Sequence, residues 1–214
     1  MTLHNNIYDK LKEAIIYGEL SPGEKLSENE LAKKMNASRT PIREALRKLE
    51  IEGYVVISPN KGASVSKLPA EEIENIYNIV RVLEGYAAEL TARRVSREEL
   101  MKLKEIQNEV SSRAQAKKYR GYVEENTKFH RFITALSGNN CLVKTVTELR
   151  ARIYRYRLTS VTIPGYLERY ASDHERIIES IAEGDSVGAR KFMEEHVGFV
   201  KEVLVEFLKD NPGY

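Results

Sequence analysis

The chain has a single cysteine, no long apolar run and almost no excess of charge of either sign. Cys141 has no second cysteine with which to form an internal disulfide, which favours a reducing compartment. No segment approaches the ~18 consecutive apolar residues that a membrane-spanning helix needs. The first residues also lack the basic stretch followed by an apolar stretch that marks a signal peptide. We therefore expect a cytoplasmic protein that does not associate with a membrane.

The near-balance of charge conceals an uneven distribution. The chain has 34 Lys and Arg residues against 32 Asp and Glu residues, a formal net charge of +2. The whole excess lies in residues 1–68, and residues 69–214 are neutral. Within the first segment the basic residues gather on one short stretch: Arg39, Arg43, Arg47 and Lys48. Such a cluster can be a nucleic-acid footprint, although a row of charges is more often a solvated helix face.

The texture of the sequence also changes near residue 68. Before it, short segments are punctuated by turn-forming residues, and beyond it long helical patterns are interrupted only briefly. We therefore expect a mainly α protein with two domains, residues 1–68 and residues 69–214.

Two helices separated by a tight turn are predicted between Ser27 and Gly53. Ser38 can cap the second helix, and Pro41 falls in its first turn, where its missing amide hydrogen is not needed. The apolar positions of this helix share one face: Ile42, Ala45, Leu46 and Leu49. The arginines share another: Arg39, Arg43 and Arg47. This pattern predicts a helix-turn-helix whose second helix enters the major groove, with the hydroxyls of Ser38 and Thr40 placed for a phosphate.

A β-hairpin is predicted directly after this helix. The β-prone runs YVVIS and GASVS flank residues 59–62, which contain Pro, Asn, Lys and Gly. A hairpin in this place forms the wing of a winged helix. Its basic tip could set Lys61 against a phosphate or into the minor groove.

The N-terminal string RTPIREALRKLEIEGYV, followed by a turn and KG-x-x-V, resembles the winged-helix domain of GntR-family bacterial transcription regulators over roughly residues 5–68. The resemblance implies that operator DNA is contacted by Ser38, Arg39, Thr40 and Arg43, with Lys61 and Gly62 at the wing tip. Asn29 stands where fatty-acid-responsive relatives carry a DNA-contacting arginine. The operator sequence is therefore expected to differ from theirs.

The remaining two thirds of the chain predict an all-α antiparallel helical bundle, in which sites are built from facing helices. Six helical stretches can be drawn, near residues 70–95, 97–117, 119–136, 140–160, 166–183 and 185–208. Three of the four histidines fall on apolar faces of three different helices: His130, His174 and His196. A single buried histidine is more often a satisfied core residue, but three that converge can share a metal ion. Asn126 precedes His130 by four residues and faces the same way, so its carbonyl could be a fourth ligand.

This second region is similar to the FCD ligand-binding domain of the FadR subfamily over roughly residues 72–208, and six helices resemble its VanR-like branch. The resemblance assigns the metal ligands by position to Asn126, His130, His174 and His196. Many members have Asp where Asn126 stands, and four neutral donors leave the charge of a divalent cation uncompensated. We therefore expect a small carboxylate effector at the metal. Zinc is the first choice for the metal, and nickel or manganese would be tolerated.

Arg81 occupies the position of an arginine that is common in the first bundle helix of that family. Its guanidinium could clamp the effector carboxylate. An ion pair with Glu84 or with a neighbouring helix is an equal alternative.

The predicted function is a sequence-specific DNA-binding transcription regulator, a homodimer on a near-palindromic operator, and more specifically a repressor, although the sign of control is open. A metal-dependent enzyme is the first alternative, but no base stands near a histidine, since Asp173 points about 100° away from His174. No enzyme is therefore expected. A purely structural DNA-binding protein would leave the inward histidines unexplained.

Overall fold

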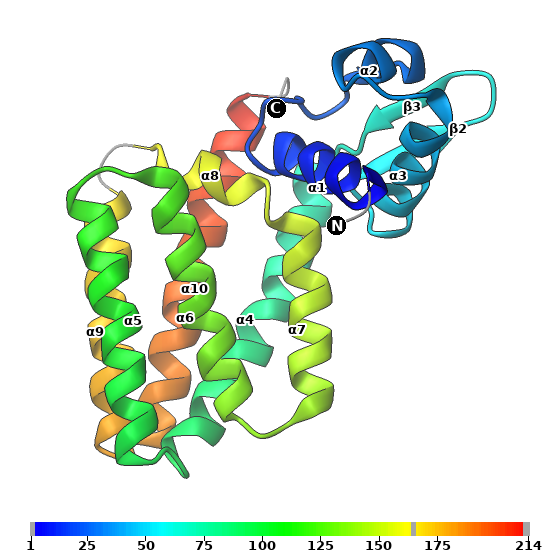
Figure 1. Ribbon diagram of the computed structural model, residues 1–214. Helices are drawn as coiled ribbons and strands as arrows, with labels where there is room; N and C mark the ends of the chain where they lie inside the picture. Colours follow the sequence, from blue (N-terminus) through cyan, green and yellow to red (C-terminus); the bar gives the residue numbers. More distant parts are fainter. Residues whose placement is uncertain (1–2, 164–165, 212–214) are drawn as a thin grey trace. The chain divides into compact units, whose positions relative to one another are not determined.

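The structure, a computed structural model, describes residues 3–163 and 166–211, which fold into two compact units (Figure 1). The border between the units lies between Pro69 and Ala70. Within the described residues, no helix combines the length and the apolar character needed to cross a membrane.

The N-terminal unit contains a small antiparallel sheet and the following elements: α1 (Leu3–Ile16), β1 (Lys25–Leu26), α2 (Glu28–Lys34), α3 (Arg39–Ile51), β2 (Val55–Ser58) and β3 (Gly62–Val65). Strands β2 and β3 form the predicted hairpin, in which Ser58 pairs with Gly62. Asn60, in the turn, adopts a positive φ of 66°, a conformation that asparagine tolerates. The sequence did not predict β1, which pairs with the other edge of β3 and gives the strand order β1-β3-β2.

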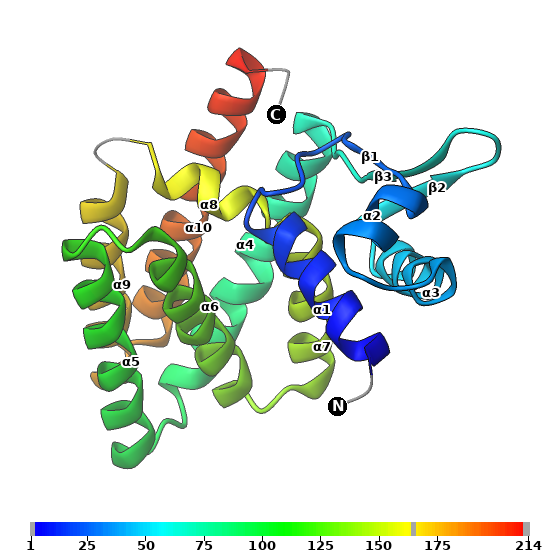
Figure 2. The same cartoon turned by 45° about the horizontal axis from the view of Figure 1, so that its top comes forward.

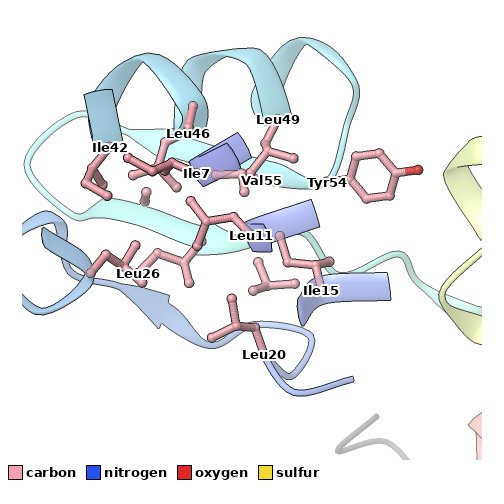
Figure 3. Close-up of a cluster of buried hydrophobic side chains, with 14 of the residues drawn as sticks. Ile7, Leu11, Ile15, Leu20, Leu26, Ile42, Leu46, Leu49, Tyr54 and Val55 are labelled. Carbon is pink, nitrogen blue, oxygen red and sulfur yellow. The ribbon is translucent and has the colours of Figure 1, made fainter. Parts of the chain in front are cut away.

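One apolar core holds α1, α3 and the sheet together (Figure 3). The helices supply side chains at helical spacing, all less than 5% exposed: Ile7, Leu11 and Ile15 from α1, and Ile42, Leu46 and Leu49 from α3. On the other face of α3, the row of Arg39, Arg43 and Arg47 is exposed. The predicted winged helix-turn-helix and the division of α3 into two faces are therefore confirmed.

The C-terminal unit is a helical bundle with the following elements: α4 (Ala70–Ala92), α5 (Arg97–Gln115), α6 (Tyr119–Leu136), α7 (Asn140–Ile153), α8 (Tyr156–Val161), α9 (Tyr166–Ala182) and α10 (Ser186–Asp210). The two longest helices, α4 and α10, pack along each other (Figure 2). Gly85 permits their close approach, because a Cβ atom at this position would lie 2.5 Å from Glu194 Cγ. The expected fold class, mainly α with an all-helical second region, is confirmed.

The predicted helix over residues 140–160 is wrong, because two helices occupy this stretch. A turn at Tyr154 and Arg155 separates α7 from α8, so the described part of the bundle has seven helices rather than six. The break lets α7 pack on α4 and α6, while α8 packs on α6, α9 and α10. No Gly or Pro marks the break, and the apolar period continues through it. The six-helix VanR-like branch, which rested on that unbroken helix, therefore loses its support.

Candidate DNA-binding face and metal centre

The start of α3 presents its polar side chains to solvent. Ser38 is the N-cap residue, with extended backbone angles (φ −76°, ψ 167°), and its hydroxyl makes no capping hydrogen bond. Ser38, Arg39 and Thr40 are all exposed. The hydroxyls and the first amide groups of the helix thus remain accessible to an anion, as a DNA phosphate would require.

Glu28, at the start of α2, holds the two leading arginines of α3. Its carboxylate accepts two hydrogen bonds from Arg43, from Nε at 3.0 Å and from Nη2 at 2.8 Å. Arg39 Nη2 lies 3.5 Å from the same carboxylate. Hydrogen bonding to Arg43 lowers the pKa of Glu28. The sequence analysis missed this contact, because it joins residues of two helices that share no periodic pattern.

The arginines and the wing tip share one groove of about 530 Å³. Its lining includes Arg39, Arg43 and Arg47 of α3 together with Lys61 and Gly62 of the wing. Asn29 of α2 also reaches the groove. The structure thus gathers four of the six predicted DNA contacts in one place and leaves Ser38 and Thr40 at the exposed start of α3. Contact of these six residues with DNA stays a prediction.

We expect Glu28→Gln to raise the affinity for random-sequence duplex DNA several-fold and to steepen its salt dependence. The substitution removes a negative charge from the groove and releases two guanidinium groups for phosphates. Folding stability should change by no more than about 1 kcal/mol, because the ion pair is exposed. Fluorescence anisotropy in a salt series measures the effect.

Glu30→Gln is the matched control, because it removes the same charge from an exposed position on the same helix. Equal gains in the two variants would show that net charge alone, and not the pair with Arg43, sets the affinity.

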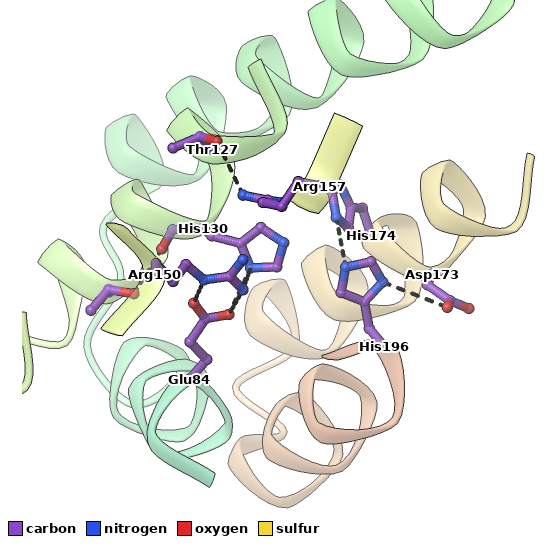
Figure 4. Close-up of polar contacts among 9 residues, drawn as sticks. Glu84, Thr127, His130, Arg150, Arg157, Asp173, His174 and His196 are labelled. Atoms are coloured by element: carbon purple, nitrogen blue, oxygen red, sulfur yellow. Dashed lines mark hydrogen bonds and ion pairs between the residues drawn. The ribbon is translucent and has the colours of Figure 1, made fainter. Parts of the chain in front are cut away.

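Three histidines converge inside the C-terminal unit (Figure 4). His130 of α6, His174 of α9 and His196 of α10 are each at most 2% exposed. One ring nitrogen from each lies within 4.8 Å of those of the other two. Phe129 stacks on the His174 ring, with centroids 3.9 Å apart, and fixes its plane. The sequence analysis predicted these three residues, and the structure brings them together.

The outer nitrogen of each imidazole faces an oxygen atom. His130 Nδ1 lies 2.8 Å from Glu84 Oε2, and His174 Nδ1 lies 2.8 Å from Gln107 Oε1. His196 Nδ1 has a looser contact with Asp173 Oδ2, at 3.6 Å. Oxygen acceptors at Nδ1 favour the tautomer in which this nitrogen is protonated and Nε2 carries the lone pair. The same outer arrangement orients histidines that ligate metals.

In this tautomer the inner nitrogens, Nε2 of each ring, carry no proton and cannot donate a hydrogen bond. Burial lowers the pKa of all three histidines, and the charge of Arg150 helps lower that of His130 to about 3, so the rings are neutral near pH 7. His174 Nε2 and His196 Nε2 are 3.3 Å apart. His130 Nε2 has no hydrogen-bond partner among the described residues. Facing lone pairs repel one another unless a cation lies between them, so this donor set fits a metal ion.

Glu84 is a buried carboxylate of the centre. It is 1% exposed and forms a two-pronged ion pair with Arg150. Burial by itself raises the pKa of Glu84, but the charge of Arg150 and the hydrogen bonds from Arg150 and His130 outweigh it and hold that pKa well below its usual range. The carboxylate therefore stays ionised and keeps His130 oriented.

The other two predicted site residues lie in different surroundings. Asn126 is buried in α6, and its Oδ1 has no partner in the described part of the chain, so it is available as a ligand. Arg81 does not pair with Glu84. It lines a groove on α4 and α10 with Val187, Arg190, Lys191, Glu194 and Glu195. The structure does not place Arg81 with the histidines, and contact between Arg81 and an effector stays a prediction.

Three residues of the centre were missed in the sequence: Glu84, Gln107 and Asp173. The sequence shows no base at a recognisable spacing from a histidine, but the structure brings Glu84 to His130 and Asp173 to His196. Asp173 does point away from His174, its neighbour in sequence, but it faces His196 on the adjacent helix. Glu84 was considered only as a partner for Arg81. No spacing within one helix could have revealed these contacts, which all cross between helices.

Comparison with known families places both units. The profile of the FCD domain matches residues 75–199, and that of bacterial regulatory proteins of the gntR family matches residues 3–65. The HTH-type transcriptional regulator YdhC of Bacillus subtilis is 29% identical over 204 residues, covering 95% of this chain and 91% of that protein. The HTH-type transcriptional repressor RspR of Escherichia coli is 24% identical over 212 residues, covering 99% and 93%.

The fold recurs in a solved structure, McbR/YncC of Escherichia coli. The TM-score is 0.80 at 21% identity, and the match covers 99% of this chain and 100% of the other. The order of the two units agrees with the order of the two matched profiles. The chain belongs to the GntR family, in its FCD-domain type, and is a DNA-binding transcription regulator rather than an enzyme.

Proposed function

We propose that the helical unit binds a small carboxylate effector at a divalent metal ion, and that this binding changes the affinity of the winged helix-turn-helix for its operator. One observation carries the proposal. Three buried, neutral imidazoles converge; the outer nitrogens of His130 and His174 lie 2.8 Å from an oxygen acceptor, and that of His196 lies 3.6 Å from Asp173. The inner Nε2 atoms then direct their lone pairs at one another without a hydrogen-bond donor between them. A metal ion bound there would accept these lone pairs.

The ligands proposed are Nε2 of His130, His174 and His196, with Oδ1 of Asn126 as the fourth. Imidazole suits zinc, and also nickel, while manganese prefers oxygen, so zinc remains the first choice. A bound divalent ion would supply a positive charge that none of these four neutral ligands cancels. An anionic effector is favoured for that reason.

We further propose that the protein acts as a homodimer and represses transcription from a near-palindromic operator. A dimer presents two recognition helices to two half-sites. An apolar stripe along α4 supports it, because Ile79, Val82 and Tyr86 are 51%, 44% and 39% exposed at helical spacing. A second copy could cover this stripe. Repression is proposed from the similarity to the repressor RspR.

We expect the protein purified with zinc to retain about one metal ion per chain and His174→Gln to retain far less, because a ligand is lost. Elemental analysis after dialysis gives the ratio. His4→Gln removes the one histidine outside the helical unit and should leave the metal content unchanged.

Equal metal content in wild type and His174→Gln would contradict the metal site. The effector is tested on the same samples by a thermal-shift screen of small carboxylates. We expect stabilisation that requires both the carboxylate and the metal. If a carboxylate stabilised the metal-free protein equally well, the effector would not bind through a metal ion.

A further inference from the structure

Arg157 of α8 is a buried cation without a counter-ion. It is 5% exposed, and its guanidinium donates one hydrogen bond, from Nη1 to Thr127 Oγ1 at 3.1 Å. Figure 4 shows its side chain directed toward Thr127. Among the side chains that the structure describes, no carboxylate lies within ion-pair distance of it. Arg150, also buried, differs in this respect because Glu84 neutralises it.

The position of Arg157 is electrostatically unfavourable in the ligand-free protein. Burial and the like charge of Arg150 lower its pKa, yet a guanidinium does not lose its proton in a protein. Its buried charge therefore persists and costs free energy. Buried charges in proteins are as a rule paired, and an unpaired one is a candidate for a site that binds an ion of opposite charge.

Two phenolic hydroxyls complete the surroundings of Arg157. Tyr77 and Tyr122 are each 1% exposed, and neither hydroxyl has a hydrogen-bond partner in the described part of the chain. Burial raises the pKa of both phenols, and the charge of Arg157 opposes it in both. The charge of Arg157 also lowers the pKa of His174, and Figure 4 draws Arg157 together with the three histidines. A cation and two free O–H donors are a set that selects an anionic acceptor.

We infer that Arg157, with the hydroxyls of Tyr77 and Tyr122, receives a second carboxylate of the effector, and that the effector is therefore a dicarboxylate. This inference rests on the proposed function, which assigns the first carboxylate to the metal centre. The donors of the second site belong to α4, α6 and α8, whereas the histidines belong to α6, α9 and α10. A dianion would thus contact five helices of the unit at once.

The experiment compares unbranched dicarboxylates of three to six carbons with monocarboxylates of the same length, titrated calorimetrically into the zinc-loaded full chain. We expect at least one dicarboxylate to bind about tenfold or more tightly than its matched monocarboxylate, since a buried charge-assisted pair forms. In Arg157→Met this preference should disappear, while monocarboxylate affinity stays within about twofold. Arg152→Met, which removes an exposed arginine paired with Glu72, should preserve the preference.

A second measurement separates an effector site from a structural role. Without effector and metal, Arg157→Met should unfold at a higher temperature than wild type, because an uncompensated buried charge is gone. A structural arginine would give the opposite shift. A lower unfolding temperature, a preference that survives in Arg157→Met, or wild type binding both classes equally would overturn the inference and leave the proposed function standing. Failure of every carboxylate to bind would overturn the proposed function itself.

Discussion

Glu84→Gln is expected to lower the free energy of unfolding of the helical unit by about 3–5 kcal/mol, the usual cost of removing one partner of a buried ion pair. Glu84 is 1% exposed and Arg150 is 9% exposed, so water cannot replace the lost carboxylate. The amide that remains has one oxygen acceptor for both Arg150 and His130. Most of the cost is the charge of Arg150 left uncompensated in the interior.

The measurement is chemical denaturation near pH 7. The folded-state pKa of Glu84 lies below its unfolded value, so its stabilisation is complete above about pH 4.3 and is lost as the pH falls further. Glu72 lies on the same helix as Glu84 and forms an exposed ion pair with Arg152 of α7. Glu72→Gln should therefore lower the free energy of unfolding by no more than about 1 kcal/mol. The double variant Glu84→Gln with Arg150→Met should recover part of the loss. If Glu84→Gln lowered the free energy of unfolding as little as Glu72→Gln does, the buried pair would contribute no more to stability than the exposed one.

Arg43→Ala is expected to weaken binding to the selected operator by about 1–3 kcal/mol for each recognition helix, or about 5- to 150-fold. Arg43 lines the groove between α2, α3 and the wing, and its side chain is 50% exposed. Its pairing with Glu28 sets the direction of the guanidinium before DNA arrives. Since an arginine that reads a base loses more on the selected sequence than on random sequence, discrimination should fall with affinity.

The operator for this test comes from selection among random duplexes, and anisotropy titrations on operator and random DNA give the two affinities. Lys10→Ala, at an exposed position of α1, controls for the loss of one positive charge. If Arg43→Ala lost the same factor on both duplexes, Arg43 would contact phosphate and not a base. Unchanged operator affinity with an unchanged salt slope would remove α3 from the DNA interface.

The winged helix-turn-helix could be predicted because its signals are local. The burial of Ile42 and Leu49 follows from a 3.6-residue period, and Pro41 marks a first turn. The three histidines could be predicted for the same reason, since each lies on the apolar face of its own helix. The contacts around them could not. Glu84 reaches Arg150 across 66 residues, and a sequence period carries no information about which helices become neighbours.

The break between α7 and α8 could not be predicted from the sequence either. Helical propensity and apolar spacing continue from residue 140 to residue 160, and only packing divides the segment at Tyr154: both parts contact α6, but α7 also packs on α4 and α8 on α9 and α10. The burial of Arg157, a residue of α8, follows from the direction that this helix takes after the break.

The three histidines lie on α6, α9 and α10, and His196 belongs to the last helix of the described chain. In a zinc finger the ligands are close in sequence, so the metal can organise the chain as it folds. Here the triad is incomplete until α10 has left the ribosome and packed on α4. The order of biosynthesis would thus make capture of the proposed metal a late event, and a chain truncated before α10 would be released without a complete site.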